Sequence, residues 1–565
     1  MIPFPPPRVL LLVVWLLPAL VGARESPPVA SKALVARVDT VFTRFTAPGS
    51  PGCAVGVSRD GASVLERAYG RANLEHNIAN TPGMVFEAGS VSKQFTAAAV
   101  LLLARDGKLS LDDSVRRHVP EVPDYGVPIT LRHLLNHTSG LRDWGTVVEA
   151  AGWPRGSRIH THAHVLDVVS RQKSLNFPPG TEFLYSNTGY NLLAIIVERV
   201  SGQSFASFTK QRLFIPLGML RTEWRDDFAR VVKARATAYV PDGKEFRSEM
   251  PFENVHGNGG LLTTVGDLLR WDDGLVRGRV GGAGFLQEME RQGQLTGGRR
   301  IEYAAGLFIT SYKGVPEVSH SGATAGYRAF LARYPRQRVT VAVLCNHAEA
   351  GPVQLAHEVA DIFLEGQVSP PPEPPKVTLT QEGLTARAGL YRNTRTGEAL
   401  DVRVRDGQLQ LEGGTPLTPV SETGFRVGDG RTQLAFDLGK EGRPTGVRML
   451  TSDGDSVAFE PVTQARPDAA RLAEYAGAYV SSEAEVTYTV VAEGDGLVLR
   501  RRPDAVYRLQ PLYADAFLAP KFGLVRFLRE PGGRVNGLSL GLGRVRDLRF
   551  TREPVPSMPT AVDRK

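Results

Sequence analysis

A proline-rich segment divides this chain and limits what it can fold into. The stretch from Gly366 to Lys376 contains five prolines within eleven residues. Proline fixes φ and has no backbone N–H, so such a stretch stays extended and cannot enter the middle of a sheet or helix. We therefore predict a linker at residues 366–377, with separate domains on either side. The total of 565 residues agrees, because one domain usually takes about 150.

The part after the linker consists of two copies of one β unit. Residues 400–411 alternate apolar and polar side chains around an Asp-Gly pair, which is typical of a hairpin. Barrel closure removes exposed strand edges, so we expect two all-β, lipocalin-like barrel units at residues 378–463 and 468–553. The matching positions, at offsets of 88, 92, 91 and 91, are Tyr391 and Tyr479, Phe425 and Phe517, Phe436 and Phe527, and Phe459 and Phe550.

The N-terminus has the pattern of an export signal. Residues 9–22 are apolar, with Arg8 before them, and Val21-Gly22-Ala23 places small residues before a cut after Ala23. Fourteen helical residues rise about 21 Å, less than the roughly 30 Å of a bilayer core. We predict a cleaved signal at residues 1–23 and a secreted or periplasmic protein with no stable membrane span; an uncleaved anchor is the alternative.

Charge and cysteine content exclude several classes of protein. Lys and Arg exceed Asp and Glu by eight, six of them before residue 366, so the basic excess is spread along the chain. Nucleic-acid binding needs basic residues gathered on one face, and we expect no nucleic-acid partner. Cys53 and Cys345 are the only cysteines, too few for a zinc ribbon or a disulfide-dense scaffold.

Ser90 and Lys93 are the first candidates for catalysis. They begin an apolar segment that runs to Leu103 and predicts a buried helix, and their spacing places them on one helix face. A serine hydroxyl needs a neighbour that takes its proton, and a lysine in apolar surroundings can do so because burial lowers its pKa. Alone the pair is weak evidence, since Ser90 could be a helix N-cap.

Two further motifs complete a recognisable set. Ser90-Val-Ser-Lys93, Tyr185-Ser-Asn187 and His320-Ser-Gly322 stand in the order and spacing of the serine β-lactamase and penicillin-binding-protein family, and the chain resembles its class C-like branch over residues 30–365. The resemblance implies an α/β (α+β) catalytic domain with a five-stranded antiparallel sheet flanked by helices. Accessory stretches agree at residues 129–140, 177–181 and 259–268.

The resemblance also implies roles for these residues. Ser90 would attack a carbonyl and form an acyl-enzyme, with Lys93 between Ser90 and Tyr185. Tyr185 would act as general base or proton relay, which is feasible for a phenol beside a cation. Asn187 would orient Lys93 and bind a substrate amide.

The third motif would form the strand that binds the substrate. The backbone N–H groups of Ser90 and Ala323 would hold the oxyanion, and Ser321 and Gly322 would lie along the substrate. His320 replaces the lysine of the Lys-Thr-Gly motif found in most β-lactamases. Because histidine charges near pH 6.5, we expect carboxylate recognition through His320 to fade above neutrality.

The His-x-Gly motif is similar to that of D-aminopeptidases, some DD-carboxypeptidases and related esterases. The layout of a catalytic domain plus two barrels also resembles D-aminopeptidases, in which a tail loop helps wall the active site, although those enzymes typically lack an export signal. We expect a serine hydrolase acting on D-amino-acid peptides or amides. An esterase or β-lactamase is the alternative, and a catalytically inactive binding or regulatory protein is the rival from another class.

Two remaining features are interpreted as structural. His160, His162 and His164 have no Glu or Asp nearby to complete a ligand set, and Thr161 looks like a helix N-cap, so we predict neither a metal nor a cofactor. The family places the hairpin at residues 52–70 beside the strand at residues 339–345. Cys53 and Cys345 can therefore lie opposite each other, and pairing is testable because Cα atoms more than about 7 Å apart cannot be bridged.

Overall fold

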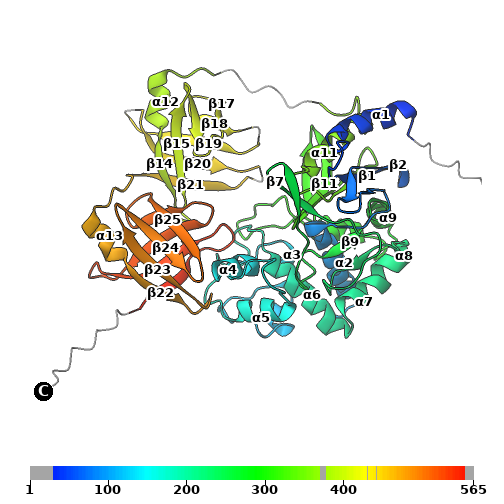
Figure 1. Cartoon of the computed structure of the whole chain (residues 1–565), viewed down its shortest axis with the longest axis horizontal. Coiled ribbons are helices and arrows are strands. Elements are labelled where there is room, and N and C mark those ends of the chain that lie inside the picture. The colour runs from blue at the N-terminus through cyan, green and yellow to red at the C-terminus, as the bar shows by residue number, and fades with distance from the viewer. Residues whose placement is uncertain (1–29, 370–376, 429, 441, 453, 554–565) are drawn as a thin grey trace, which may run out of the picture.

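A computed structural model describes residues 30–369, 377–428, 430–440, 442–452 and 454–553. The expected signal at residues 1–23 and most of the expected linker lie outside these ranges. The described chain forms a mixed α/β part followed by two β structures, drawn in yellow and in orange to red in Figure 1.

The α/β part is organised around one antiparallel sheet. Its strand order is β10-β11-β12-β13-β1-β2. The sheet has one strand more than the five expected, because β10 pairs with β11 along its full length. The strands are β1 (Cys53–Arg59), β2 (Ala62–Tyr69), β10 (Phe308–Tyr312), β11 (Val315–Thr324), β12 (Tyr327–Tyr334) and β13 (Val339–Cys345).

Helices cover both faces of this sheet. Every residue of β13 is buried, and its side chains alternate between two apolar clusters. Val341 and Val343 face α1 and α11, whereas Ala342 and Leu344 face the cluster that contains α2 and α9. The helices of this part are α1 (Lys32–Val41), α2 (Lys93–Arg105), α3 (Leu131–Leu135), α4 (Trp144–Ala150), α5 (His162–Ser170), α6 (Asn187–Ser201), α7 (Phe205–Thr209), α8 (Ile215–Leu217), α9 (Val265–Val276), α10 (Phe285–Met289) and α11 (Pro352–Phe363).

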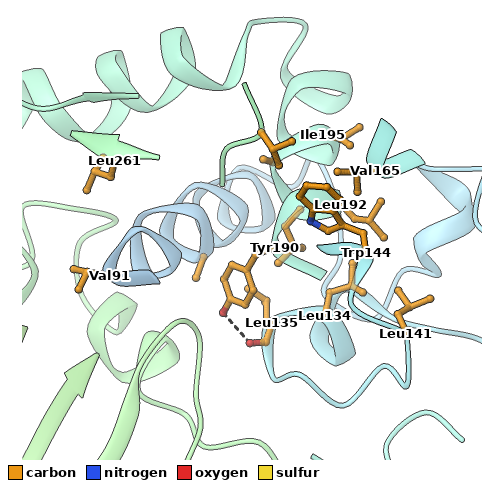
Figure 2. Packing of buried hydrophobic residues seen from close by; sticks show 14 of the residues in the cluster. Val91, Leu134, Leu135, Leu141, Trp144, Val165, Tyr190, Leu192, Ile195 and Leu261 are labelled. Carbon is orange, nitrogen blue, oxygen red and sulfur yellow. Dashed lines mark hydrogen bonds between the residues drawn. The ribbon is translucent and has the colours of Figure 1, made fainter. Parts of the chain in front are cut away.

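Helix α2 runs through the centre of the larger cluster. Its residues from Lys93 to Leu103 are all buried, and α6 packs beside it. Figure 2 shows Tyr190 of α6 donating its hydroxyl to the carbonyl of Leu135, at 2.8 Å. A helix buried on all sides places its first-turn lysine away from water. Short sheets complete the domain: β3 (Arg71–Asn73) with β4 (Ile78–Ala79), β5 (Phe86–Glu87) and β6 (Glu223–Trp224) with β9 (Leu261–Thr263), and β7 (Tyr239–Asp242) with β8 (Glu245–Ser248).

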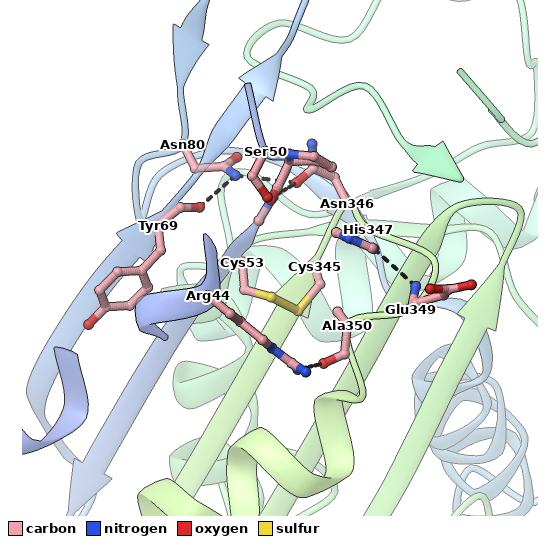
Figure 3. Close-up of a disulfide and its surroundings, with 12 residues drawn as sticks. Arg44, Ser50, Cys53, Tyr69, Asn80, Cys345, Asn346, His347, Glu349 and Ala350 are labelled. Carbon is pink, nitrogen blue, oxygen red and sulfur yellow. Dashed lines mark hydrogen bonds between the residues drawn. A yellow bond between two sulfur atoms is a disulfide. The ribbon is translucent and has the colours of Figure 1, made fainter. Parts of the chain in front are cut away.

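A disulfide joins the first and last strands of this domain. Cys53 of β1 lies opposite Cys345 of β13, with a Cα–Cα distance of 4.0 Å and an S–S distance of 2.07 Å (Figure 3). The expected proximity of the two cysteines is therefore confirmed, and they form a disulfide. Since 292 positions separate the two cysteines, the crosslink encloses nearly the whole domain.

The two β structures confirm the predicted repeat. The second is a closed eight-stranded barrel, whereas the end strands of the first, β16 and β17, are joined only by a bridge between Gln410 and Pro416. Tyr391 and Tyr479 each donate a hydroxyl to the carbonyl four residues earlier. Their elements are α12 (Gln381–Arg387), β14 (Gly389–Asn393), β15 (Ala399–Arg405), β16 (Gln408–Leu411), β17 (Leu417–Pro419), β18 (Gly424–Val427), β19 (Gln433–Leu438), β20 (Pro444–Leu450) and β21 (Ser456–Val462), then α13 (Ala469–Tyr475), β22 (Gly477–Ser481), β23 (Val486–Glu493), β24 (Gly496–Arg501), β25 (Ala505–Pro511), β26 (Ala516–Ala519), β27 (Gly523–Arg529), β28 (Val535–Gly541) and β29 (Leu548–Arg552).

The second barrel docks on the α/β domain beside α4 (Figure 1). A buried ion pair between Arg142 and Glu483 joins them, with a nitrogen–oxygen distance of 2.5 Å. The Tyr488 hydroxyl also donates to the carbonyl of Ala150, at 2.7 Å. Within the described ranges, none of the helices has both the length and the apolar character that crossing a bilayer requires.

Candidate active site

Ser90 lies in the 3₁₀ turn η2 (Gly89–Ser92), directly before α2 and against β11. Two glycines permit this close approach. A Cβ on Gly322 would lie 2.0 Å from the carbonyl oxygen of Ala88, and a Cβ on Gly89 would lie 2.5 Å from the nitrogen of Ala323. Gly89 also has a φ of +51°, which favours glycine. The turn and the strand therefore meet backbone to backbone beside Ser90.

Lys93 is buried and makes three polar contacts. Its Nζ lies 3.1 Å from Ser90 Oγ, 2.9 Å from Asn187 Oδ1 and 2.7 Å from the carbonyl oxygen of Asn258. The last two atoms can only accept hydrogen bonds, whereas the serine hydroxyl can donate as well. A neutral amine has two hydrogens and one lone pair, so this geometry directs the lone pair toward Ser90.

Burial shifts the pKa values of Lys93 and Tyr185 in opposite directions. It lowers the pKa of Lys93 well below its usual value, and the positive charges of Arg544 and Arg155 lower it further. Burial raises the pKa of Tyr185, and a hydrogen bond with Ser90 offsets part of that rise. Both groups are thus driven toward their neutral forms.

Tyr185 and Asn187 both lie beside Lys93. Lys93 Nζ lies 4.7 Å from the centre of the Tyr185 ring. Asn187 begins α6, and its backbone N–H donates to Asp143 Oδ2 at 2.7 Å. On the other side, Asn258 Oδ1 accepts from the side chain of Asn191. The two groups that accept from Lys93 are therefore themselves held in place.

His320 is neutral, which corrects one expectation. Burial, assisted by the charge of Lys93, lowers the pKa of His320 to about 3. Its Nδ1 lies 2.6 Å from the carbonyl oxygen of Ser321 and must carry the proton, so its Nε2 accepts from the Tyr303 hydroxyl at 3.1 Å. The expectation that His320 recognises carboxylates through a charge near neutral pH is wrong, because burial disfavours the charged form of its ring.

The expected substrate strand borders a cavity of about 520 Å³. Strand β10 pairs with β11 only as far as Ser319, so in the described sheet the residues from His320 to Thr324 have no strand partner on that side. Ser321 and Ala323 are exposed to the cavity, while Gly322 is buried against η2. The cavity is lined by Gly89, Ser90, Arg155, Tyr185, Asn187, Asn258, Gly259, Phe308, His320, Ser321, Gly322, Ala323, Thr324, Arg328, Pro352, Val353 and Arg544.

A loop of the second barrel forms part of the cavity wall, as the resemblance to D-aminopeptidases implied. Arg544 lies between β28 and β29, and its guanidinium is 4.9 Å from the centre of the Tyr185 ring. The same loop is anchored by Arg546, which donates to Glu182 at 3.0 Å, and by the carbonyl of Asp547, which accepts from Arg142. The barrel therefore reaches the candidate catalytic residue Tyr185.

The structure adds residues that the sequence motifs did not single out. Asn258 directly precedes the accessory stretch at residues 259–268, so the sequence next to it already indicated the family. His137 lies inside another such stretch; its Nδ1 accepts from the backbone of Ser186, and its ring packs 4.2 Å from that of Tyr185. Tyr303 and Arg544 lie in none of the motifs or accessory stretches that indicate the family.

The histidines of residues 160–164 serve in packing and capping. Thr161 is the N-cap of α5, and its backbone N–H donates to His164 Nδ1 at 3.1 Å. His160 lies 3.1 Å from the carbonyl oxygen of Trp153, and His162 lies 3.0 Å from that of His256. Across the described part of the chain, no group of three or more His, Cys, Asp or Glu side chains has an arrangement that could hold a metal ion.

Comparison with known proteins agrees with this geometry. The chain matches the Beta-lactamase family over residues 38–363. It is 31% identical over 420 residues to penicillin-binding protein 4* of Bacillus subtilis, covering 68% of this chain and 90% of that protein. It is 28% identical over 546 residues to the D-aminopeptidase of Gluconobacter oxydans, covering 92% of this chain and 99% of the relative.

Solved structures share the fold. An octameric penicillin-binding protein homologue from Pyrococcus abyssi has a TM-score of 0.54 at 26% identity, covering 75% of this chain and 100% of its own. The D-amino acid amidase of Ochrobactrum anthropi has a TM-score of 0.51 at 23% identity, covering 59% and 98%. With the family match spanning more than half of its length, the chain belongs to the beta-lactamase family and is a serine hydrolase on that fold.

Proposed function

We propose that this protein is an exported serine hydrolase that forms an acyl-enzyme on Ser90 with peptides or amides of D-amino acids. The observation that carries the proposal is the contact between Lys93 and Ser90, because it places a desolvated amine 3.1 Å from the candidate nucleophile. Nucleophilic catalysis by serine requires such a neighbouring base.

The pKa directions favour Lys93 as the first proton acceptor. The lowered pKa of Lys93 makes its neutral amine the base that accepts the Ser90 proton. The raised pKa of Tyr185 keeps it a phenol in the resting enzyme, so Tyr185 donates a proton to the leaving group and regains one from Lys93. The backbone N–H groups of Ser90 and Ala323 stabilise the oxyanion, and Asn187 binds the substrate amide.

The relatives support the substrate class. The D-aminopeptidase of Gluconobacter oxydans aligns with 92% of this chain, including both β structures. A neutral His320 in place of a lysine gives this site no cation in the third motif, which argues against a dedicated penicillinase. An esterase acting through the same groups is the second candidate, because the acyl-enzyme chemistry is shared.

Export is supported by two features of the chain. The apolar segment at residues 9–22 ends in small residues that suit cleavage after Ala23. The bond between Cys53 and Cys345 is of the kind that persists in an oxidising compartment.

Mass spectrometry after incubation with a fluorophosphonate tests the nucleophile. We expect one adduct on Ser90, none in Ser90→Ala, and normal labelling in the control Ser170→Ala, which removes a hydroxyl from the exposed end of α5. A wild-type protein without an adduct would favour the rival of an inactive binding or regulatory protein.

A substrate panel then tests the class of reaction. We expect D-alanine p-nitroanilide or a D-Ala-D-Ala peptide to be cleaved faster than nitrocefin, a p-nitrophenyl ester or L-alanine p-nitroanilide. Faster ester cleavage with no preference for the D isomer would favour the esterase.

A further inference from the structure

The active-site cavity is lined by positive charge. Three arginines line it, Arg155, Arg328 and Arg544, and none of its described lining side chains is a carboxylate. The three differ in what neutralises them, and this difference identifies the one that is available to a ligand.

Two of these arginines already have acidic neighbours. Arg155 donates through its Nε to Glu253 Oε2 at 2.8 Å, and a second contact joins the same side chains. Arg544 lies over the Tyr185 ring, with Asp143 4.0 Å away. Their charges are therefore partly satisfied within the protein.

Arg328 has no such neighbour. Its Nη1 donates to the carbonyl oxygens of Ala325 and Tyr327, each at 2.7 Å. In the described parts of the chain, no carboxylate lies within 4.0 Å of its guanidinium, and its Nε and Nη2 have no protein acceptor. Glu249, an exposed side chain that lines the adjoining cavity, is the carboxylate whose charge acts to raise the pKa of Arg328. Burial lowers the pKa of Arg328, so the positive charge of its guanidinium is only partly solvated.

A network of charged side chains lies behind the cavity, and it does not cancel the charge of Arg328. Arg225 and Arg235 both contact Glu87, at 2.9 and 3.4 Å, while Glu253 is shared between Arg155 and Arg225. Three guanidinium groups thus face two carboxylates, and the network retains one positive charge.

The sheet register fixes where Arg328 lies relative to the reaction. Arg328 of β12 is directly opposite Ala323 of β11, whose N–H marks the position of the reacting carbonyl. Opposite residues have Cβ atoms about 5 Å apart. Tyr185 and His320 lie together, with ring centres 6.2 Å apart, and Tyr185 serves the leaving group. Arg328 also lines the adjoining cavity of about 630 Å³, together with Ala323 and Thr324. It therefore lies toward the acyl side.

We propose that Arg328 is a specificity residue that binds a carboxylate on the acyl part of the substrate, close to the scissile carbonyl. The inference rests on the proposed function and narrows it to D-amino-acid substrates whose acyl part carries a carboxylate, on the side chain or on an N-acyl group. The α-ammonium of D-alanine p-nitroanilide would meet the three arginines of the active-site cavity at an electrostatic cost, so we expect that compound to be a poorer substrate than one whose acyl part carries a carboxylate. The carboxylates of Glu249 and Glu253 line the adjoining cavity and not this one. A carboxylate would gain two charge-assisted hydrogen bonds from Nε and Nη2.

Calorimetry on the Ser90→Ala variant tests the inference without turnover. The two ligands are N-succinyl-D-alaninamide, which carries a carboxylate, and neutral N-acetyl-D-alaninamide. We expect the succinyl compound to bind about tenfold more tightly, with the preference falling as salt increases. Adding Arg328→Gln should abolish the preference, and Arg328→Lys should keep part of it because the charge remains.

The matched control is Arg405→Gln, which removes one exposed charge from β15 and should leave the preference unchanged. Equal binding of the two ligands, or a preference that survives Arg328→Gln in a variant with an unchanged melting temperature, overturns the inference. The corresponding p-nitroanilides, tested on the wild-type enzyme, should differ mainly in KM. A binding preference without cleavage of either p-nitroanilide would refute the proposed function and leave the anion site standing.

Discussion

Replacing Gly322 by alanine should inactivate the enzyme without unfolding it. The added Cβ would lie 2.0 Å from the carbonyl oxygen of Ala88 and 3.1 Å from the nitrogen of Ser90. An ordinary carbon–oxygen contact is about 3.3–3.6 Å, so β11 and η2 must separate by more than about 1 Å. That separation moves the Ala323 N–H away from the Ser90 N–H, and both are the proposed oxyanion donors.

The expected loss follows from the displaced donor. Losing one oxyanion donor typically lowers kcat by about 10²–10³, and a misplacement of about 1 Å elsewhere in an active site has a similar effect. We expect kcat for the best substrate of the panel to fall by about that factor, with a smaller change in KM. Fluorophosphonate labelling of Ser90 should slow as well, since its phosphoryl oxygen uses the same donors.

Gly297→Ala is the matched control, because its added Cβ has no heavy atom within 4 Å and its backbone is not left-handed. It should retain full activity. Circular dichroism and a melting curve would confirm that Gly322→Ala is folded. Wild-type turnover in a folded Gly322→Ala protein would refute the proposed position of the oxyanion site.

Three further predictions concern the base, the docked barrel and the disulfide. If neutral Lys93 is the base, kcat/KM should rise with pH through the pKa of Lys93, well below 10.5, and then level off, because deprotonation activates the amine. Lys93→Arg should abolish turnover in steady-state assays at every pH. Glu483→Gln leaves the buried charge of Arg142 without its partner, which should lower the free energy of unfolding, measured with denaturant, by about 3 kcal/mol. A decrease below about 0.5 kcal/mol would show that the carbonyl groups around Arg142 stabilise its charge without Glu483. Replacing Cys53 and Cys345 together by alanine should lower the free energy of unfolding by about 4 kcal/mol, and a reducing agent should then lower the melting temperature of the wild type but not of the variant.

The catalytic groups were predictable because their chemistry lies in short motifs. Ser90 and Lys93 are three positions apart, one in the 3₁₀ turn η2 and the other at the start of α2, so their proximity follows from local helical geometry. Asn187 starts the neighbouring helix α6, and Tyr185 lies two residues before it. The place of both depends on the packing of α6 against α2, which only the family resemblance supplied.

Residues that reach the site through tertiary packing could not be predicted from local sequence patterns. Arg328 lies beside the oxyanion position through the register of β12 with β11, and a shift of one residue would turn it to the other face. Arg544 comes from a loop of a different domain. The additional strand β10 was missed for a related reason, since its residues are mostly half-buried and do not alternate.

The repeat could be predicted from the sequence because the core of a barrel requires particular residue types at fixed positions. Phe425 and Phe517 are both buried at corresponding places in the two β structures, so their spacing survives in the sequence. The charge state of His320 was not readable, because it depends on burial rather than on residue type.

The position of Arg544 has a consequence for the order in which the enzyme becomes complete during synthesis. Ser90, Lys93 and Tyr185 leave the ribosome long before residues 535–552, which form the hairpin that carries Arg544. A nascent chain can therefore hold its nucleophile and base while one wall of the cavity does not yet exist. The cavity wall that Arg544 forms is in place only when the second barrel has folded and docked through Glu483.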